Sequence, residues 1–442
     1  MAIHLHEHFG YRKLFRFTFP SIIMMLFTGI YGAVDAVFVA NFTTPSHFAA
    51  VNLVWPVLFL LGAFGFMIGS GGSALISKTL GEGDKKKANE IFSFLVYFSL
   101  ILSGVLSVLG LFFLRPIATL LTSDPATQSY CVTYGSIFLC ALPMAIMQFE
   151  LNALFVAAEK PKLGLFVTVA AGCTNILLDA LFIVVFHWGI VGAAVATACG
   201  YVVGGAIPLI YFSRKNTSLL RLGKARVDFK ALAKTCTNGL SEFMANISVC
   251  LVTILYNDRL QKIAGELGVN AYAAIACVGF IFLAIFLGYS SGVAPVIGFH
   301  FGAKNKEELR GLFKRSLAII GTLSVLLFLS SLLLASPLAT LYAGGNSEMY
   351  ETTMHGFTLY CFSYLISGLN IFASAFFTAL NDGGVSATIS FLRTFALQVL
   401  FIFLLPVFWG LNGIWLAALF AELGCLVASL LFLICKRKKY EY

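Results

Sequence analysis

The sequence predicts an all-α polytopic membrane protein with twelve transmembrane helices in two pseudo-symmetric six-helix lobes. Three observations support this prediction: the composition, a series of long apolar segments, and an internal repeat. Residues of the set AVILMFWYC make up 59% of the 442 positions, charged residues make up 11%, and the mean hydropathy is +0.91. Soluble domains hold about 45–50% apolar and about 25% charged residues, so the composition excludes a soluble enzyme, a nucleic-acid-binding protein and a disordered scaffold.

The apolar segments have the length of membrane spans. A spanning helix needs about 20 predominantly apolar residues. Polar interruptions divide the chain into about twelve such segments, near 14–40, 48–77, 90–114, 130–157, 163–186, 190–212, 233–256, 270–298, 312–335, 353–379, 386–408 and 412–435. The longest hydrophilic stretch lies between the sixth and the seventh. We therefore expect an N-lobe over residues 1–212, a cytoplasmic linker over 213–232 and a C-lobe over 233–442.

Basic residues set the expected orientation. Lys and Arg concentrate in alternate loops and near both termini, whereas the opposite face keeps Arg115, Arg259 and Lys262. Because cytoplasmic loops carry the excess of Lys and Arg, we predict a multi-pass protein of the inner (cytoplasmic) membrane with both termini in the cytoplasm. The net charge of +9 then indicates topology and contact with membrane lipid, not nucleic acid. The polar N-terminal segment with His4, His6 and His8 is expected to be a flexible tail, and a metal site at these histidines is the alternative.

The two halves of the sequence resemble each other. A displacement of 221 residues brings five glycine pairs into register, against about two expected by chance for 40 glycines. The pairs are Gly71/Gly292, Gly81/Gly302, Gly135/Gly356, Gly189/Gly410 and Gly192/Gly413. Six spans return the chain to the side where it began, so the halves are parallel repeats. Transporters with this plan bind substrate between the halves.

Ionisable residues at membrane depth indicate function, because they are costly there. Counted along their spans, Asp35, Asp179 and Thr197 lie about 8–11 Å below the outer surface, and Asn175 is one helical turn from Asp179 on the same face. This oxygen-rich group suits sodium, a hard cation, or a proton shared by two carboxylates. A hydrogen-bonded network that only joins helices is the alternative. The positions 221 residues further on hold Tyr256, Ala396, Leu400 and Ala418. The cluster therefore belongs to one half, which favours a functional site.

The second half carries its own charged residues at membrane depth, namely Glu242, Arg393 and Glu422. An Arg within a span is nearly always paired, so we expect an ion pair of Arg393 with Glu242 or Glu422. All three are also candidates for substrate or gating contacts. In the first half, Glu150 lies near the inner end of its span and is expected to extend to the membrane interface.

Two loop segments at corresponding positions of the halves carry a family resemblance: Leu80-Gly81-Glu82-Gly83-Asp84 and Phe301-Gly302-Ala303-Lys304-Asn305. Together with the two six-helix halves, they resemble the multidrug and toxic compound extrusion (MATE) transporters over nearly the whole chain. The resemblance implies two lobes that form a V-shaped cleft. It also implies an antiporter that exports organic, often cationic, compounds against an inward flow of sodium ions or protons.

Within that family, the first half is most similar to prokaryotic members of the DinF-like type. The cation ligands implied by this similarity are Asp35, Asn175, Asp179 and Thr197. The similarity also implies that the first helix bends at Pro20, and that Tyr134 and Asn152 line a polar cavity. Met25 is a further cavity candidate, because Met side chains adapt to varied ligands.

The remaining predictions concern the class of protein. The sequence has no GxxxxGK[ST] motif, so ATP is not the expected energy source, and no HExxH or HxxxD pattern, so an enzyme is not expected. We expect no cofactor besides the coupling ion, a small organic compound as the partner, and a monomer. The alternative is a flippase for a lipid-linked or other amphiphilic substrate. Such proteins line the cleft with several basic residues, whereas only Arg393 is available here.

Overall fold

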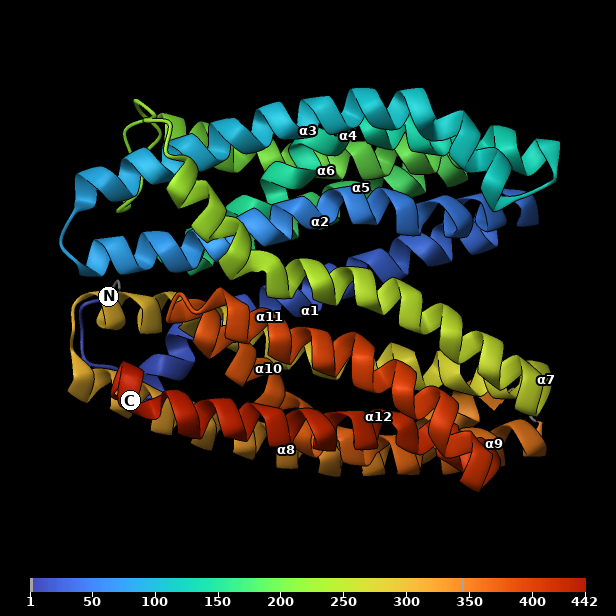
Figure 1. The fold of residues 1–442 in the computed structure, drawn as a ribbon. Helices are drawn as coiled ribbons and strands as arrows, with labels where there is room; N and C mark the ends of the chain where they lie inside the picture. Colours follow the sequence, from blue (N-terminus) through green and yellow to red (C-terminus); the bar gives the residue numbers. More distant parts are fainter. Residues whose placement is uncertain (1–2, 344–345) are drawn as a thin grey trace.

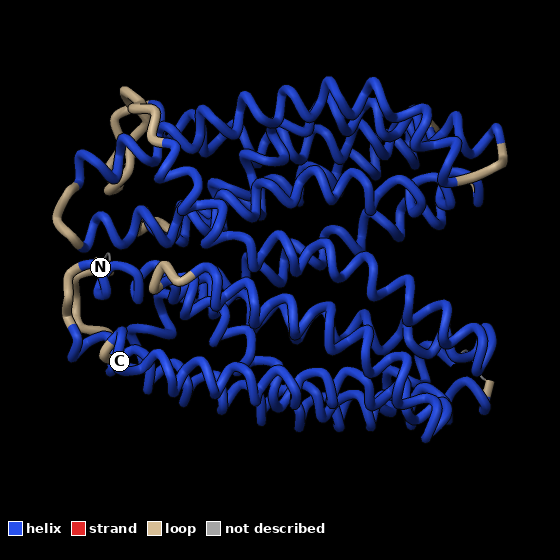
Figure 2. The backbone as a smooth tube through the Cα atoms, in the orientation of Figure 1, coloured by secondary structure: helices blue, strands red, loops and turns tan. Residues whose placement is uncertain are grey.

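The computed structural model describes residues 3–343 and 346–442, which are almost entirely helical and contain no strand (Figure 2). The first half of the chain, called the N-half below, forms six helices. They are α1 (Tyr11–Phe42), α2 (Pro45–Gly81), α3 (Lys85–Leu121), α4 (Pro125–Ala157), α5 (Pro161–Asp179) and α6 (Gly189–Ser213). A π-helical segment, Ala180–Val185, extends α5. The all-α prediction is confirmed.

The second half of the chain, called the C-half, contains two unusually long helical stretches. Its helices are α7 (Phe229–Gly302), α8 (Lys306–Ala343), α9 (Ser347–Tyr360), α10 (Tyr364–Ala379), α11 (Gly383–Phe391) and α12 (Leu397–Tyr440). The stretches Phe229–Gly302 and Gly383–Tyr440 are 74 and 58 residues long, and each contains a non-helical glycine, Gly265 or Gly410. By length and composition, ten helical stretches of the described chain can cross a membrane. The count of twelve spans stays a prediction, and the two glycine breaks are where the further two would begin.

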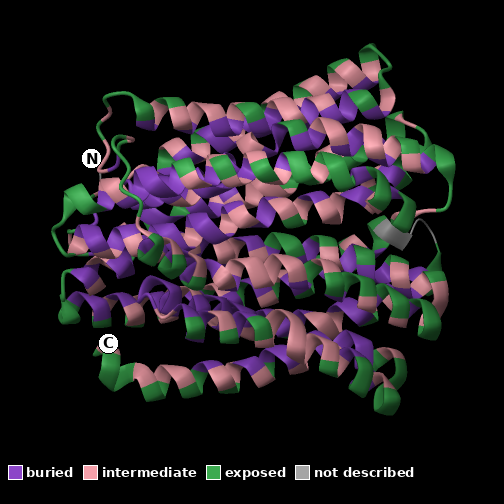
Figure 3. Ribbon diagram, turned by 45° about the horizontal axis from the view of Figure 1, so that its top comes forward, coloured by how far each residue is buried: buried purple, intermediate pink, exposed green. Residues whose placement is uncertain are grey.

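Both chain termini lie at the same end of the helix bundle, which is called the terminal end below (Figure 1). The N-half and the C-half form the two layers of this view, and α7 runs along the boundary between them. Peripheral helices expose large apolar side chains such as Phe112 (77%) and Val407 (78%), which suits contact with lipid. Buried residues are most concentrated toward the terminal end (Figure 3).

The internal repeat is visible in the backbone of two loops. Gly83 and Lys304, 221 residues apart, both adopt a left-handed conformation, with φ of 88° and 56°. The next residue in each loop, Asp84 or Asn305, caps the following helix by accepting a hydrogen bond from a backbone N–H three residues on, at 2.9 and 3.1 Å. The duplication predicted from the sequence is therefore repeated in the conformation of these two loops.

Glycines allow the two halves to pack backbone against backbone toward the terminal end. A Cβ atom added at Gly71 of α2 would lie 2.0 Å from the carbonyl oxygen of Thr235 in α7, and one added at Gly239 would lie 1.8 Å from that of Met67. Nearer the end, a Cβ at Gly302 would lie 2.1 Å from the carbonyl oxygen of Lys78. Such distances leave no room for any side chain, so the halves are closed against each other here.

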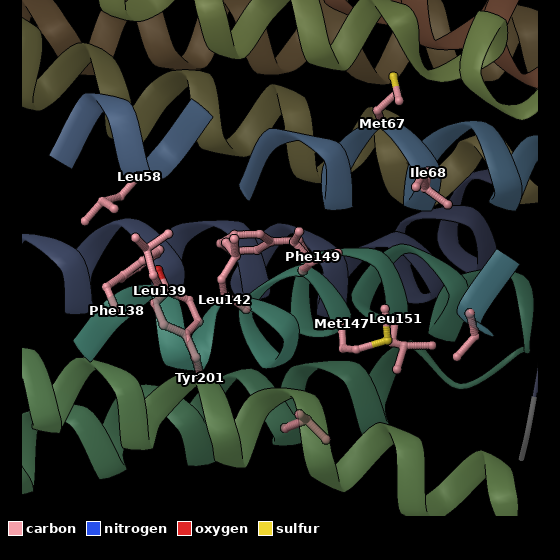
Figure 4. Packing of buried hydrophobic residues seen from close by; sticks show 14 of the residues in the cluster. Leu58, Met67, Ile68, Phe138, Leu139, Leu142, Met147, Phe149, Leu151 and Tyr201 are labelled. Carbon is pink, nitrogen blue, oxygen red and sulfur yellow. The ribbon is translucent and has the colours of Figure 1, made fainter. Parts of the chain in front are cut away.

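An apolar core holds α4 and α6 of the N-half together (Figure 4). The ring of Tyr201 lies edge-on to Phe138 and Phe149, with centroid distances of 5.5 and 5.7 Å. Phe66 of α2 stacks on Phe149 at 4.3 Å. Aromatic pairs in these geometries add about 0.5–1.5 kcal/mol each beyond the burial of their area. The helices that carry the polar groups described next are therefore well supported.

The N-terminal segment differs from the prediction of a flexible tail. Leu5 and Phe9 are both 0% exposed and belong to an apolar cluster that includes Tyr289 and Phe372 of the C-half. This burial could not be predicted, because isolated apolar residues in a polar segment have no periodicity to detect.

Candidate functional site

Three helices of the N-half bring the predicted cation ligands to one place. Asp35 is on α1, Asn175 and Asp179 are on α5, and Thr197 is on α6. Small residues let these helices approach. A Cβ added at Gly172 of α5 would lie 2.6 Å from the Phe27 ring of α1, and one at Gly200 of α6 would lie 3.1 Å from Cβ of Asn175.

The predicted ligands are buried and lack hydrogen-bond partners. Asp179 is 0% exposed, Asn175 3% and Thr197 8%, whereas Asp35 is half-buried and lies close to the side chains of Asp179 and Asn175. Atoms without a partner include Oδ1 of Asp35, both carboxylate oxygens of Asp179, the Asn175 amide and the Thr197 hydroxyl. Most buried polar side-chain atoms have a partner. A cluster of unpartnered oxygens suits a site for a sodium ion or a proton.

A change of helix type follows Asp179 directly. α5 ends at Asp179 and continues as the π-helical segment Ala180–Val185, and a second π-helical segment, Leu392–Ala396, contains Arg393 of the C-half. Both segments therefore adjoin a charged residue at membrane depth. π-helical turns are rare and frequently occur at functional sites. Neither π-helical segment could be predicted from hydropathy, because a hydropathy profile contains no information about backbone hydrogen bonds.

The other candidates of the N-half are not all in one environment. Tyr134 on α4 is 1% exposed, and its unpartnered hydroxyl is close to Asp35 and Thr197, so it borders the cation cluster. Asn152 is half-buried, with an unpartnered side-chain oxygen. Met25 is also half-buried, on α1. The structure thus groups Tyr134 with the acids and leaves Asn152 and Met25 as separate cavity candidates.

Glu150 does not extend to the membrane interface, so that prediction is wrong. Its side chain is 0% exposed, and neither carboxylate oxygen has a hydrogen-bond partner. α2 covers it, because Gly69 lies so close to α4 that an added Cβ would be 2.8 Å from Cα of Glu150. The position of Glu150 along its own span could not predict this burial, because the burial is caused by a different helix.

In the C-half, Arg393 forms the expected ion pair, and its partner is Glu422. Nη1 of Arg393 lies 3.6 Å from Oε1 of Glu422, which is 4% exposed. Asn370 of α10 donates hydrogen bonds to Oε2 and to the backbone carbonyl of Glu422 at 2.7 and 2.9 Å, and it accepts one from Ser429 at 2.9 Å. Glu242 is half-buried on α7 and within electrostatic range of Arg393. Sequence reasoning missed Asn370 and Ser429, because neutral polar residues are common in spans.

Removal of Arg393 alone should be strongly destabilising. The Arg393→Met variant leaves the Glu422 carboxylate buried without its cation, which typically costs about 3–5 kcal/mol. The double variant Arg393→Met/Glu422→Gln should recover most of the lost stability, because Gln still accepts the hydrogen bond from Asn370. Thermal unfolding of purified protein measures both effects, and equal melting temperatures for the single and double variants would show that the pair is not energetically coupled.

Pro20 is buried within α1, which continues without a break from Tyr11 to Phe42. Proline lacks the N–H that would bond to the carbonyl four residues earlier, so α1 can bend there at low cost. The adjacent turn packs on the C-half: a Cβ at Gly288 of α7 would lie 2.5 Å from Cα of Ile22. We expect Pro20→Ala to slow transport several-fold with no loss of folded protein. Transport at the wild-type rate would contradict a hinge at Pro20.

Two related helical halves, with ten helical stretches in the described chain that can cross a membrane, indicate a multi-pass membrane protein. The MatE family model matches residues 20–181 and 243–404, and the chain belongs to this family of multidrug efflux transporters. The two matches cover corresponding parts of the two halves, in agreement with the structural repeat. The resemblance to MATE transporters is confirmed.

Curated relatives are similar over nearly the full length. The chain is 27% identical to the multidrug export protein MepA of Staphylococcus haemolyticus over 426 residues, covering 94% of this chain and 91% of that protein. It is 24% identical to MepA of Staphylococcus aureus strain MSSA476, covering 97% and 94%.

Solved structures share the fold. A crystal structure of MATE in complex with MaL6 superposes with a TM-score of 0.92 at 20% identity, covering 99% of this chain and 97% of that one. An outward-facing conformation of a multidrug resistance MATE family transporter superposes with a TM-score of 0.88 at 21% identity, with the same coverage.

Proposed function

We propose that this chain is a secondary antiporter that exports organic, often cationic, drug-like compounds across the inner membrane in exchange for sodium ions or protons. The observation that carries the proposal is the cluster of Asp35, Asn175, Asp179 and Thr197, whose buried oxygens have no partners. Relatives named as multidrug export proteins support the substrate class. No cofactor other than the coupling ion is needed, and a monomer with lipid around it suffices for this geometry.

The terminal end is proposed to face the cytoplasm. The loops at that end and the C-terminal segment carry most of the basic residues, including Lys85–Lys87 and Lys436–Lys439. Excess Lys and Arg marks the cytoplasmic side. With this orientation, the close glycine contacts between α2 and α7 shut the cytoplasmic side, and the acids of the cation cluster lie in the outer half of the membrane.

The proposed mechanism is alternating access. A cation that enters from outside binds among the oxygens of the cluster and stabilises one arrangement of α1, α5 and α6 over the other. A ligand shifts such an equilibrium only by the difference in its affinity for the two states. Bending of α1 at Pro20 would transmit this difference to α7, against which the inner part of α1 packs. The halves then part at the cytoplasmic end and admit substrate.

Small organic compounds fit the candidate cavity residues of the two halves better than the phosphate group of a lipid-linked substrate does. Arg393 is the basic residue at membrane depth in the C-half, and Glu422 already neutralises its charge. Tyr134, Asn152, Met25 and Glu242 offer hydroxyl, amide, thioether and carboxylate groups to an organic cation. The flippase alternative needs an unpaired basic side chain in the cleft, so the ion pair of Arg393 argues against it.

Transport by reconstituted vesicles tests the proposal. Vesicles that contain the protein are loaded with a fluorescent cationic dye or a fluoroquinolone, and a sodium gradient or a pH gradient is imposed separately. One of the two gradients should accelerate substrate movement relative to protein-free vesicles, and collapse of that gradient by an ionophore should remove the effect. Movement that depends on neither gradient would contradict an antiporter.

A further inference from the structure

The N-terminal segment, residues 4–9, contacts both halves of the protein at the terminal end. At its beginning it binds the N-half. Nδ1 of His4 lies 2.7 Å from Oε2 of Glu159, and the backbone N–H of Leu5 donates to Oε1 of the same carboxylate at 2.6 Å. Glu159 is in the short loop between α4 and α5, where its left-handed backbone (φ 60°) is fixed by loop hydrogen bonds.

Four residues further on, the same segment binds the C-half in the same manner. Nδ1 of His8 lies 2.6 Å from Oε2 of Glu308, and the backbone N–H of Phe9 donates to Oε1 at 2.9 Å. Arg315 of α8 donates to the carbonyl oxygen of Phe9 at 2.7 Å and pairs with Glu308 at 2.9 Å. Each carboxylate therefore holds one histidine and the backbone N–H of the apolar residue that follows it.

The two apolar residues of the segment are buried in an apolar cluster made mostly of C-half residues. Leu5 and Phe9 are each 0% exposed, and the Phe9 ring lies edge-on to Phe17 of α1 and to His300 of α7, at 5.7 and 6.5 Å. Full burial of a side chain of this size contributes about 1.5–3 kcal/mol. Hydrogen bonds to two carboxylates and the burial of Leu5 and Phe9 show that this segment is ordered and attached to the protein.

We propose that residues 4–9 form a strap that ties the two halves together at the terminal end, and that one of its two attachments must break before that end can open. The proposal rests on the alternating access proposed above. From Leu5 to Phe9 the chain can extend at most about 14 Å, so it cannot follow a wide separation of Glu159 from Glu308.

The attachment to Glu159 is the one that should release first. It consists of two contacts with Glu159, whereas the attachment to the C-half has the burial of Leu5 and Phe9 and the additional bonds from Arg315 to both the strap and the Glu308 carboxylate. His4 is also half exposed, so water competes for its contact with Glu159. The strap thereby stabilises the state that is closed at the terminal end and slows its conversion.

Amide hydrogen exchange of the full-length protein in lipid nanodiscs tests the strap. The variants are Glu159→Ala, His4→Ala and, as a matched control, Glu307→Ala, an exposed acid next to Glu308. Glu159→Ala should accelerate exchange several-fold in residues 3–10 and also in the facing parts of α2 and α7 near Gly71 and Gly239. His4→Ala, which removes an exposed side chain and should not affect folding, should cause a smaller change in the same segments. Glu307→Ala should match the wild type.

The outcomes separate the strap from the proposed function. Faster exchange confined to residues 3–10, with α2 and α7 unchanged in both strap variants, would overturn the strap. If α2 and α7 of the wild type showed no change in exchange between sodium-loaded, proton-loaded and ion-free conditions, alternating access itself would fail. Faster exchange of α2 and α7 in Glu159→Ala, beside an unchanged control, is the result that the strap requires.

Discussion

Asp35→Asn and Asp179→Asn should each reduce ion-coupled export to the level of protein-free vesicles, while the protein still folds and inserts. Each substitution keeps the shape of the side chain but removes a charge and a proton-accepting group from the cluster. One carboxylate remains in each variant, but the other neighbouring groups, the Asn175 amide and the Thr197 hydroxyl, are neutral and cannot supply the second charge. The measurement is substrate efflux from vesicles under the gradient that drives the wild type.

The control for these variants is an acid outside the cluster. Asp258 on α7 is exposed and pairs with Lys262 at 2.7 Å, so Asp258→Asn makes the same chemical change at a place where exposed ion pairs contribute about 0–1 kcal/mol. It should export at the wild-type rate. Efflux at the wild-type rate in either Asp35→Asn or Asp179→Asn would remove the acidic cluster from the coupling mechanism.

Gly239→Ala should have the second-largest effect, because its added methyl group would lie 1.8 Å from the carbonyl oxygen of Met67. The backbones of α2 and α7 must move apart to admit it, and overpacking of this kind costs about 1–3 kcal/mol. The added methyl group therefore destabilises the state closed at the terminal end by this amount. A shift of this size changes the ratio of the two states by about 5–150-fold. The terminal end should therefore open more often. Amide exchange of α2 and α7 should become faster, and the efflux rate should change with it.

Glycines without neighbours provide the matched control for Gly239→Ala. A Cβ added at Gly104 of α3 or at Gly321 of α8 would meet nothing within 4 Å. Gly104→Ala and Gly321→Ala should be neutral or stabilise the helix by about 0.5–1 kcal/mol, since alanine loses less entropy on folding. If Gly239→Ala behaved like these two variants, the close contact between the halves would not control their movement.

The helical class and the duplication could be predicted because both depend on properties summed over many residues. Apolar composition determines membrane insertion, and the glycine register survives because close helix contacts accept no other residue. At Gly71 and Gly302, the structure shows the contact that explains each glycine. The same reasoning placed Asp35 and Asp179 at one depth, since depth follows from position along a span.

Features that depend on contacts between distant segments could not be predicted. The burial of Glu150 depends on Gly69 of another helix, and the support of Glu422 by Asn370 joins α12 to α10. The π-helical turn after Asp179 is a backbone pattern that side-chain hydropathy does not encode. The strap was missed for a similar reason, because its partners lie about 150 and 300 residues away in the chain.

Ion movement driven by substrate is the most direct test of the central claim that the acids of the N-half couple the two flows. Vesicles containing the wild type are given an outward gradient of substrate and no ion gradient, and internal sodium and pH are recorded. The wild type should take up sodium ions or protons as substrate leaves, and the Asp35→Asn/Asp179→Asn variant should take up neither. Equal ion uptake by the wild type and this variant would contradict the account.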